Sequence, residues 1–391
     1  MTNGDSHDIT LTAQCLCKAH TFSTQVPRSK LPLDGFICHC TSCRNVTGAM
    51  YTSCTNWLGP VDDVLSSDLT RYEFTTNSTL FFCRACSSPL FWEDHYQDRP
   101  RNVLAFTGVL NNAPLDDLIN FSYQHFVGDT NDGGVSPWLQ HINRDGVKPR
   151  LWKERSQTSD ELSDDCSKCT TVSSDEGAKK DDIPFHCRCR GVDLVFSPGR
   201  VDFSSMDAES IPFYIDPKSH KHLATLDPCS SCRGSVGVDI MSWTFALFRQ
   251  IDFATRSEEQ DFPRNTHELK DAVQSCSRDP RYGTLAMYRS SPDVQRYFCL
   301  RCSATVFYAV DDRPDVIDVA VGLLHASEGA RAESLLAWHL GAKMMAEGDL
   351  VGGWREGFAK SVKEASEQWR IKKGVPKTWA RLASEGGQKQ G

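Results

Sequence analysis

The sequence predicts a mainly β protein made of two tandem domains and a helical C-terminal segment. Two observations lead to this prediction. An ordered cysteine pattern occurs twice along the 391 residues, and short runs of aromatic and β-branched residues, bounded by turn residues, surround it. Hydrophobic residues make up 39% of the chain, which is enough to form packed cores and argues against a disordered protein.

The cysteine pattern has three parts, which come in the same order in each half. The first half contains Cys15-x-Cys17, Cys38-His39-Cys40-x-x-Cys43-Arg44 and Cys83-x-x-Cys86. The second half contains Cys187-x-Cys189, Asp227-Pro228-Cys229-x-x-Cys232-Arg233 and Cys299-x-x-Cys302. Gly48 and Gly237 each lie five residues beyond the last cysteine of the middle part. This many matches in one order indicate an internal duplication.

The composition between and after the repeats suggests where the domains end. Residues 156–182 contain eight acidic residues against three lysines and few apolar ones, which is typical of a flexible tether. A polar stretch near 250–290 has no counterpart in the first half, and we expect it to be a surface loop with Cys276 as a lone thiol. We predict a first domain over residues 8–152 and an acidic linker over 153–182. A second domain with C-terminal helices follows over 183–372, and a tail over 373–391.

Individual elements follow from local pattern. Short apolar, aromatic or β-branched runs predict strands over residues 80–82, 89–92, 103–106, 192–196 and 304–308. Helix-forming residues with a helical apolar pattern predict helices over 332–338 and 358–365.

Charge and targeting signals exclude several classes of protein. The net charge of −8 and the pI of about 5.8 argue against a nucleic-acid binder, which would carry a basic face. No stretch approaches the ~20 apolar residues that a membrane span needs. Residues 1–8 lack a basic region followed by an apolar one, so we expect no secretory signal and a cytoplasmic location, with the nucleus also open. Seventeen cysteines, an odd number, then favour metal ligation over a disulfide framework.

The outer parts of each cysteine pattern predict structural zinc sites. Structural zinc is commonly held by four cysteines in a tetrahedron, and a CxC and a distant CxxC supply four. The two predicted sets are Cys15, Cys17, Cys83 and Cys86 in the first half, and Cys187, Cys189, Cys299 and Cys302 in the second. A closed site of this kind staples distant strands together and performs no reaction.

The middle part of the first half predicts a different kind of site. Cys38, Cys40 and Cys43 offer three thiolates, and three protein ligands leave a fourth zinc position for water or substrate. An electron-rich zinc of this kind suits the activation of an incoming thiol, whose pKa it would lower. His39 or Cys54 as a fourth ligand is the structural alternative. Arg44 either pairs with an acidic side chain or binds the carboxylate of an anionic thiol.

The second half departs from this pattern, since Asp227 takes the place of Cys38. Asp227, Cys229 and Cys232 form either a weaker metal site or one that has degenerated. The linker pair Cys166 and Cys169 is either an extra metal or redox pair or two solvated cysteines in a tether. A disulfide oxidoreductase is disfavoured, because no βαβ pattern surrounds any CxxC pair.

These motifs resemble the glutathione-dependent formaldehyde-activating enzyme family. The resemblance rests on the CxC, the CHCxxCR with its following glycine, and the FCxxC, and it extends over about 8–152 and 183–330. The family shares its domain with centromere protein V and has the Mss4-like, zinc-stapled β fold. By resemblance, Cys38, Cys40 and Cys43 would hold the zinc that glutathione can approach, and the two four-cysteine sets would hold structural zinc.

The resemblance implies a carbon–sulfur lyase that joins glutathione and formaldehyde into S-hydroxymethylglutathione. We therefore expect about three zinc ions per chain, and as partners a small thiol and a small aldehyde. No obvious general base accompanies the site, and His39 is the only near candidate in the sequence, so we expect a slow enzyme. The alternative is a zinc-stabilised interaction module without catalysis, since a fold alone does not set function.

Overall fold

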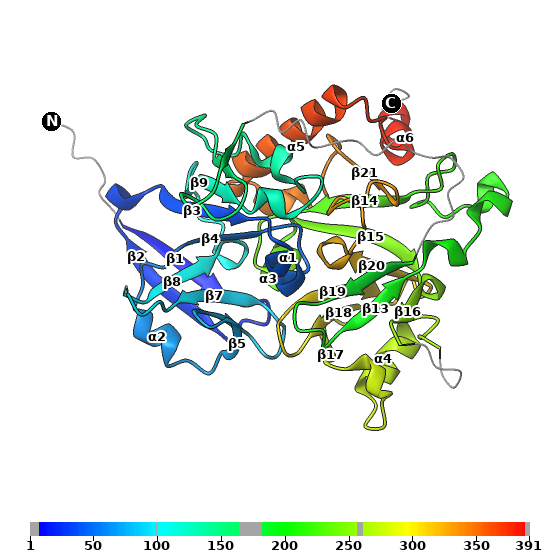
Figure 1. Cartoon of the computed structure of the whole chain (residues 1–391), viewed down its shortest axis with the longest axis horizontal. Helices are drawn as coiled ribbons and strands as arrows, with labels where there is room; N and C mark the ends of the chain where they lie inside the picture. Colours follow the sequence, from blue (N-terminus) through cyan, green and yellow to red (C-terminus); the bar gives the residue numbers. More distant parts are fainter. Residues whose placement is uncertain (1–7, 99, 164–181, 256–260, 388–391) are drawn as a thin grey trace.

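The protein consists mainly of β-strands, as predicted. The computed structural model describes residues 8–98, 100–163, 182–255 and 261–387. Their strands form two large sheets, of nine and seven strands, and two small ones, of two and three strands. Figure 1 shows the two large sheets side by side, with the C-terminal helices along one edge of both. None of the helices in these residues combines the length and apolar character needed to cross a bilayer.

The first half forms the two-stranded and the nine-stranded sheets. The large sheet has the order β11-β10-β9-β3-β4-β8-β7-β6-β5. The strands are β1 (Ile9–Gln14), β2 (Thr21–Val26), β3 (Leu33–Cys38), β4 (Thr52–Asn56), β5 (Thr70–Thr75), β6 (Ser78–Phe82), β7 (Pro89–Asp94), β8 (Asn102–Phe106), β9 (Ile119–His125), β10 (Arg150–Trp152) and β11 (Glu161–Leu162), and the α-helices are α1 (Thr41–Thr47) and α2 (Val61–Leu65).

The second half forms the three-stranded and the seven-stranded sheets. Its large sheet has the order β17-β18-β19-β20-β15-β14-β21. The strands are β12 (Ile183–His186), β13 (Asp193–Phe196), β14 (His222–Asp227), β15 (Met241–Leu247), β16 (Ile251–Phe253), β17 (Leu285–Ser291), β18 (Val294–Cys299), β19 (Thr305–Val310), β20 (Val316–Ala320) and β21 (Leu336–Trp338), and the α-helices are α3 (Ser230–Val236), α4 (Thr266–Gln274), α5 (Arg355–Lys372) and α6 (Trp379–Gly387).

The two large sheets repeat one strand order. The seven strands β9-β3-β4-β8-β7-β6-β5 correspond in sequence to β21-β14-β15-β20-β19-β18-β17. Within these seven strands the first pair is parallel, β3 with β9 and β14 with β21, and the other pairs are antiparallel. In the nine-stranded sheet, β10 adds a second parallel pair with β9. The duplication inferred from the cysteines therefore extends to the topology.

Burial explains why these segments are strands. Every residue of β6 is buried, as expected for an aromatic-rich strand inside a sheet whose two faces are covered. The outer strand β5 alternates between partly buried and exposed residues, the period-two pattern of an edge strand with one solvent face. All five strands predicted from the sequence are present, as β6, β7, β8, β13 and β19.

The hydrophobic core runs across both halves. One continuous cluster of buried apolar side chains includes residues of both large sheets and of α5. Helix α5, whose residues 358–365 were predicted to be helical, buries Phe358, Val362 and Trp369 at helical spacing. Its buried Arg355 donates to Asp239 Oδ1 in the second half, at 2.7 Å, and to the carbonyl of Leu110 in the first, at 3.0 Å. The two halves therefore pack against each other around a shared core. The predicted division into 8–152 and 183–372 corresponds to the two copies of the sequence repeat.

Two sequence predictions of local structure were wrong. The segment 332–338 is not a helix, because Leu336 and Trp338 are buried in β21, where parallel pairing with β14 outweighs helix propensity. The segment near 250–290 is not only a surface loop, because it contains α4. Asn265 caps this helix by accepting the Glu268 N–H.

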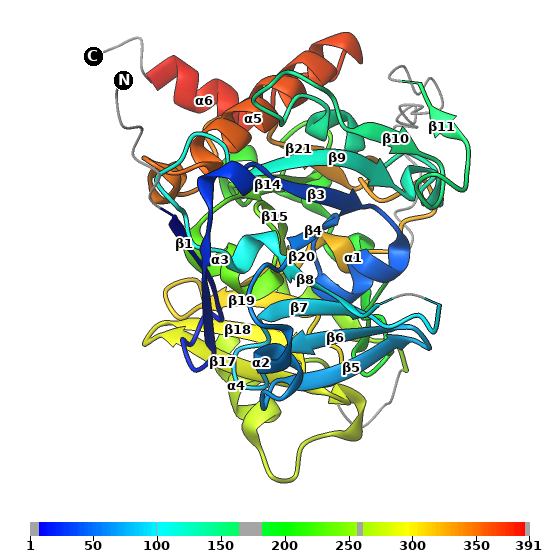
Figure 2. The same cartoon turned by 90° about the vertical axis from the view of Figure 1, so that its left-hand side faces the viewer.

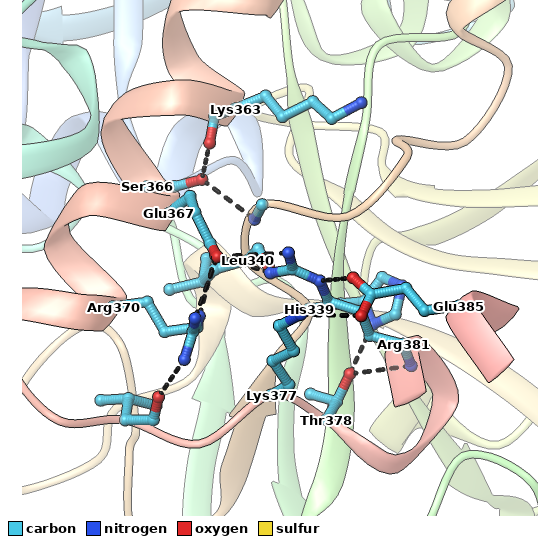
Figure 3. Close-up of polar contacts among 12 residues, drawn as sticks. His339, Leu340, Lys363, Ser366, Glu367, Arg370, Lys377, Thr378, Arg381 and Glu385 are labelled. Atoms are coloured by element: carbon cyan, nitrogen blue, oxygen red, sulfur yellow. Dashed lines mark hydrogen bonds and ion pairs between the residues drawn. The ribbon is translucent and has the colours of Figure 1, made fainter. Parts of the chain in front are cut away.

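The C-terminal residues 373–391 contain a helix within the predicted tail. Helix α6 is joined to α5 by ion pairs around Glu367, which Figure 3 shows in detail. The predicted linker falls mostly outside the described residues, and so do Cys166 and Cys169.

Candidate metal centres

The first closed cluster joins the loop after β1 to the loop after β6. The sulfurs of Cys15, Cys17, Cys83 and Cys86 all lie within 4.8 Å of one another. Backbone N–H groups point at two of them: His20 donates to Cys15 Sγ at 3.3 Å, and Cys17 donates to Cys86 Sγ at 3.4 Å. Hydrogen bonds of this kind stabilise thiolates, the form in which cysteine binds zinc. The donor set therefore fits a tetrahedral zinc ion.

The second closed cluster has the same construction. Cys187, Cys189, Cys299 and Cys302 again lie within 4.8 Å of one another. Val192 and Gly191 donate backbone N–H groups to Cys187 Sγ and Cys189 Sγ at 3.3 and 3.4 Å. The structure thus brings together both four-cysteine sets predicted from the sequence, and each could hold zinc.

The first-half open cluster consists of Cys38, Cys40 and Cys43. Cys38 ends β3, Cys40 caps the N-terminus of α1, and Cys43 lies in its first turn, which brings the three sulfurs within 4.8 Å. Cys38 and Cys43 are buried and Cys40 is half-buried. Hydrogen bonds from the Cys38 and Cys43 thiols lower the pKa of Cys40 to about 3, so Cys40 carries the thiolate. Among the described residues, no other cysteine, histidine or carboxylate belongs to this group.

Neither alternative fourth ligand belongs to the open cluster. Cys54 lies on β4 in the apolar core, where burial raises its pKa well above the usual value. His39 points away toward Gln124, whose side-chain N–H donates to the Leu139 carbonyl at 2.8 Å. Gln124 Oε1 is therefore an acceptor, and His39 Nε2 donates to it at 2.7 Å. Burial lowers the pKa of His39 to about 4, so the ring is neutral and its Nδ1 is an acceptor.

Residues that the sequence pattern does not reveal surround this cluster. His125 on β9 pairs in register with Cys38, and burial lowers its pKa to about 4. Thr130 Oγ1 and His39 Nδ1 are both buried, and neither has a hydrogen-bond partner. Both lie near Gly134, where an added Cβ would be in ordinary contact with them at 3.8 and 3.9 Å. The parallel pairing of β3 with β9 brings His125 beside Cys38, and no sequence motif signals this pairing.

Arg44 is buried and incompletely bonded. Its Nη2 donates to Thr41 Oγ1 at 3.3 Å, whereas Nε and Nη1 have no partner. The pKa of Arg44 is lowered by burial, an effect opposed by the charges of Asp132 and Asp129. The corresponding arginine of the second half is better satisfied, because Arg233 Nε donates to the Pro228 carbonyl at 2.8 Å.

The second-half cluster contains the three groups predicted from the sequence. Asp227, Cys229 and Cys232 offer ligand atoms within 4.8 Å of one another. Cys229 caps α3 as Cys40 caps α1. The Cys232 thiol donates to Asp227 Oδ2 at 3.2 Å, and the Cys229 N–H donates to Asp227 Oδ1 at 2.8 Å. Cys276, by contrast, is an exposed free thiol.

Each open cluster is supported by the opposite half. Helix α1 ends at Gly48 and helix α3 at Gly237, both in the left-handed conformation. Gly322 donates its N–H to the Gly48 carbonyl at 3.0 Å, and Gly108 donates to the Gly237 carbonyl at 2.9 Å. The contact is thus reciprocal, with the turn after β8 against α3 and the turn after β20 against α1. Figure 2 shows α1 and α3 at about mid-height of the view, α3 to the left and α1 to the right.

Comparison with known proteins identifies one segment. Residues 10–129 match the family model described as glutathione-dependent formaldehyde-activating enzyme. No curated protein and no solved structure gives a match. The matched segment contains the whole first closed cluster and the whole first-half open cluster, whereas membership of the second half stays a prediction supported by its strand order. The resemblance to the glutathione-dependent formaldehyde-activating enzyme family is therefore confirmed for residues 10–129.

Proposed function

We propose that the first half catalyses the addition of a small thiol, such as glutathione, to a small aldehyde such as formaldehyde, and the reverse reaction. One observation carries the proposal: Cys38, Cys40 and Cys43 form a group of three, whereas the closed clusters contain four sulfurs each. Three protein ligands are the usual arrangement of a catalytic zinc, with one position for substrate. A zinc ion held by the three sulfurs would stabilise the incoming thiol as its thiolate.

The reaction balances without a redox partner. The thiolate sulfur attacks the carbonyl carbon, a C–S bond forms, and the electron pair of the C=O π bond moves to oxygen, which then takes up a proton. The product is a hemithioacetal, S-hydroxymethylglutathione in the case of glutathione and formaldehyde. The reverse reaction breaks the C–S bond, which makes the enzyme a carbon–sulfur lyase.

The chain's own residues contribute position and charge. Cys40 is the most exposed of the three cysteines, so a ligand that comes from solvent would meet its sulfur first. Arg44 has two nitrogens without a hydrogen-bond partner, Nε and Nη1, and suits the carboxylate of an anionic thiol, since guanidinium binds carboxylates in bidentate fashion. His39 can accept a proton at Nδ1, but with a pKa of about 4 it is a weak base. We therefore expect a modest rate enhancement.

Substitution of Cys40 tests the proposal. Cys40→Ala leaves two sulfurs in the open cluster, so we expect the rate of adduct formation, measured by exchange NMR with glutathione and formaldehyde, to fall to the uncatalysed background. Cys276→Ala, which removes an exposed thiol, is the matched control and should keep the wild-type rate. An unchanged rate in Cys40→Ala would reject the enzymatic function. It would leave the non-catalytic, zinc-stabilised interaction module as the alternative.

A further inference from the structure

The second-half cluster lies beside a buried arginine. Arg296 on β18 is only 5% exposed. Its Nη1 donates to Cys232 Sγ at 3.7 Å, its Nη2 to Ser231 Oγ at 2.8 Å and its Nε to Ser290 Oγ at 3.0 Å. The guanidinium carbon lies 4.9 Å from the ring centre of Tyr308. Three hydrogen bonds and a ring contact thus fix a positive charge against a sulfur of the cluster.

Strand register identifies the corresponding position in the first half. Arg296 pairs with Tyr288 and Tyr308 on the adjacent strands. In the first large sheet, the same position relative to the CxxC is Leu80, which pairs with Tyr72 and Trp92. Leu80 is fully buried and carries no charge. Arg296 is therefore a charged replacement at one position of an otherwise repeated framework.

The first-half open cluster lacks this contact. Arg44 is the arginine next to Cys43 in the sequence, but only its Nη2 is bonded, and it donates to Thr41 Oγ1. None of its N–H groups is bonded to a cluster sulfur. Among the described residues, no guanidinium is hydrogen-bonded to a sulfur of Cys38, Cys40 or Cys43, whereas Arg296 bonds Cys232 in the second half.

The carboxylate of the second-half cluster is also already engaged. Asp227 Oδ1 accepts the N–H of Cys229, and Oδ2 accepts the thiol hydrogen of Cys232. Zinc binding would require Cys232 to lose that hydrogen, since thiolate is the ligand form. It would also place a dication close to the buried guanidinium, where repulsion between like charges is weakly screened. The donor set is present, but its surroundings do not fit a metal ion.

We infer that Arg296 takes the place of the metal in the second half, so that Asp227, Cys229 and Cys232 bind no zinc. Three zinc sites then remain in the part of the chain that the structure describes, which are the two closed clusters and the first-half open cluster. The inference concerns a cluster that the proposed function does not use, and it stands whether or not the first half is an enzyme.

Zinc content of the full-length chain, measured by native and elemental mass spectrometry, tests this inference. We expect three zinc ions in the wild type and the same number in Cys229→Ser. Arg296→Leu, which installs the residue found in the first half, should gain one zinc ion. Arg289→Leu is the matched control, because it removes an arginine of the neighbouring strand that is 45% exposed and lies 3.9 Å from Asp311. This variant should keep the wild-type count.

Each result is decisive. If Cys229→Ser holds one zinc ion fewer than the wild type, then the wild type binds metal at the second-half cluster, which overturns the inference. An Arg296→Leu protein that folds and still holds the wild-type number also overturns it, since the arginine would then not be what excludes the metal. If Arg296→Leu does not fold, Arg296→Met retains more of the side-chain length without the charge and must show the same gain. The Cys229→Ser measurement tests the inference without either Arg296 variant.

Discussion

The two halves have the same strand order and the same four-cysteine cluster, but they differ in one row of side chains that crosses four strands of each large sheet. In the first half the row contains only uncharged aromatic and aliphatic side chains, and in the second it contains an arginine and an aspartate. The two rows are Tyr72, Leu80, Trp92 and Leu104, and Tyr288, Arg296, Tyr308 and Asp318. The closed clusters thus keep their composition while the open clusters and their surroundings diverge. This difference is expected if the closed clusters stabilise the fold and the open clusters have a role other than stability.

The largest effect should come from breaking a closed cluster. Cys83→Ser and Cys299→Ser each remove one of the four sulfurs that could hold zinc, and metal binding in such sites contributes directly to folding. We expect each to lower the free energy of unfolding by about 4 kcal/mol or more, the upper range for single substitutions. Denaturant unfolding at fixed zinc concentration measures this.

The open-cluster variants Cys43→Ser and Cys232→Ser are the matched controls for this comparison. Both cysteines are buried in the first turn of a short helix, so burial alone would make all four substitutions similar. Smaller losses in the controls than in Cys83→Ser and Cys299→Ser would support a structural role confined to the closed clusters. Equal losses in all four would refute the division into closed and open clusters.

The second-largest effect concerns the aspartate of the second row. Burial raises the pKa of Asp318 to about 7, partly opposed by Arg313, and Asp227 raises it further while Arg296 lowers it. The native state therefore holds this proton at pH values where the unfolded chain has released it. Stability should fall as the pH rises from below 4 to above 7, by roughly 4 kcal/mol in all, because the pKa is raised by about three units and each unit corresponds to about 1.4 kcal/mol.

Asp318→Asn removes this titration while keeping the shape of the side chain. The difference in unfolding free energy between wild type and variant should therefore change with pH in the stated direction, and zinc-linked effects common to both cancel. Asp311→Asn, at a position where the side chain is 30% exposed, is the control and should follow the wild-type profile more closely. Parallel profiles for wild type and Asp318→Asn would show that burial does not hold the proton on Asp318.

The reciprocal glycines should give a smaller and more specific effect. A Cβ at position 322 would lie 2.1 Å from the Ala49 carbonyl oxygen, and a Cβ at 108 would lie 2.4 Å from the Val238 nitrogen. Backbone atoms cannot yield as a side chain can, so Gly322→Ala and Gly108→Ala should each cost about 2 kcal/mol. Only Gly322→Ala places its added Cβ against the end of α1. It alone should therefore lower the zinc affinity of Cys38, Cys40 and Cys43, which chelator competition measures. Equal zinc affinity in the two variants would show that α1 is positioned without the second half.

The sequence predicts the cysteine groups and the short strands but not what lies around them. Cysteine spacing constrains which sulfurs share a metal, because a CxxC must present two sulfurs to one ion, and all four predicted groups are present. His125 and Gln124 reach the open cluster only through the parallel pairing of β3 and β9, which no local pattern encodes. The contact of Arg296 with the second-half cluster could not be predicted either, because it depends on the register of β18 with its neighbouring strands. Helix propensity over 332–338 failed where buried β-pairing decided the structure.

The smallest effect should come from a feature without a counterpart among the described residues of the first half, the ion-pair network that joins α5 to α6 (Figure 3). Glu367 bonds Arg370 at 2.8 Å and Arg381 at 2.6 Å, and the first of these contacts is the main reason that its pKa is lowered to about 2. A depressed pKa means that the network stabilises the protein above the ordinary value near 4.5 and loses this effect as the pH falls toward 2. Because the carboxylate is partly exposed, solvent screening reduces the contribution to about 1 kcal/mol. Glu367→Gln should therefore cost this amount at pH 7, measured by denaturant unfolding, and nothing near pH 2. The control Glu356→Gln, on the first turn of the same helix, should lower the free energy of unfolding by less at pH 7. A changed zinc content in Glu367→Gln would show that the C-terminal helices support the metal sites, which the fold does not predict.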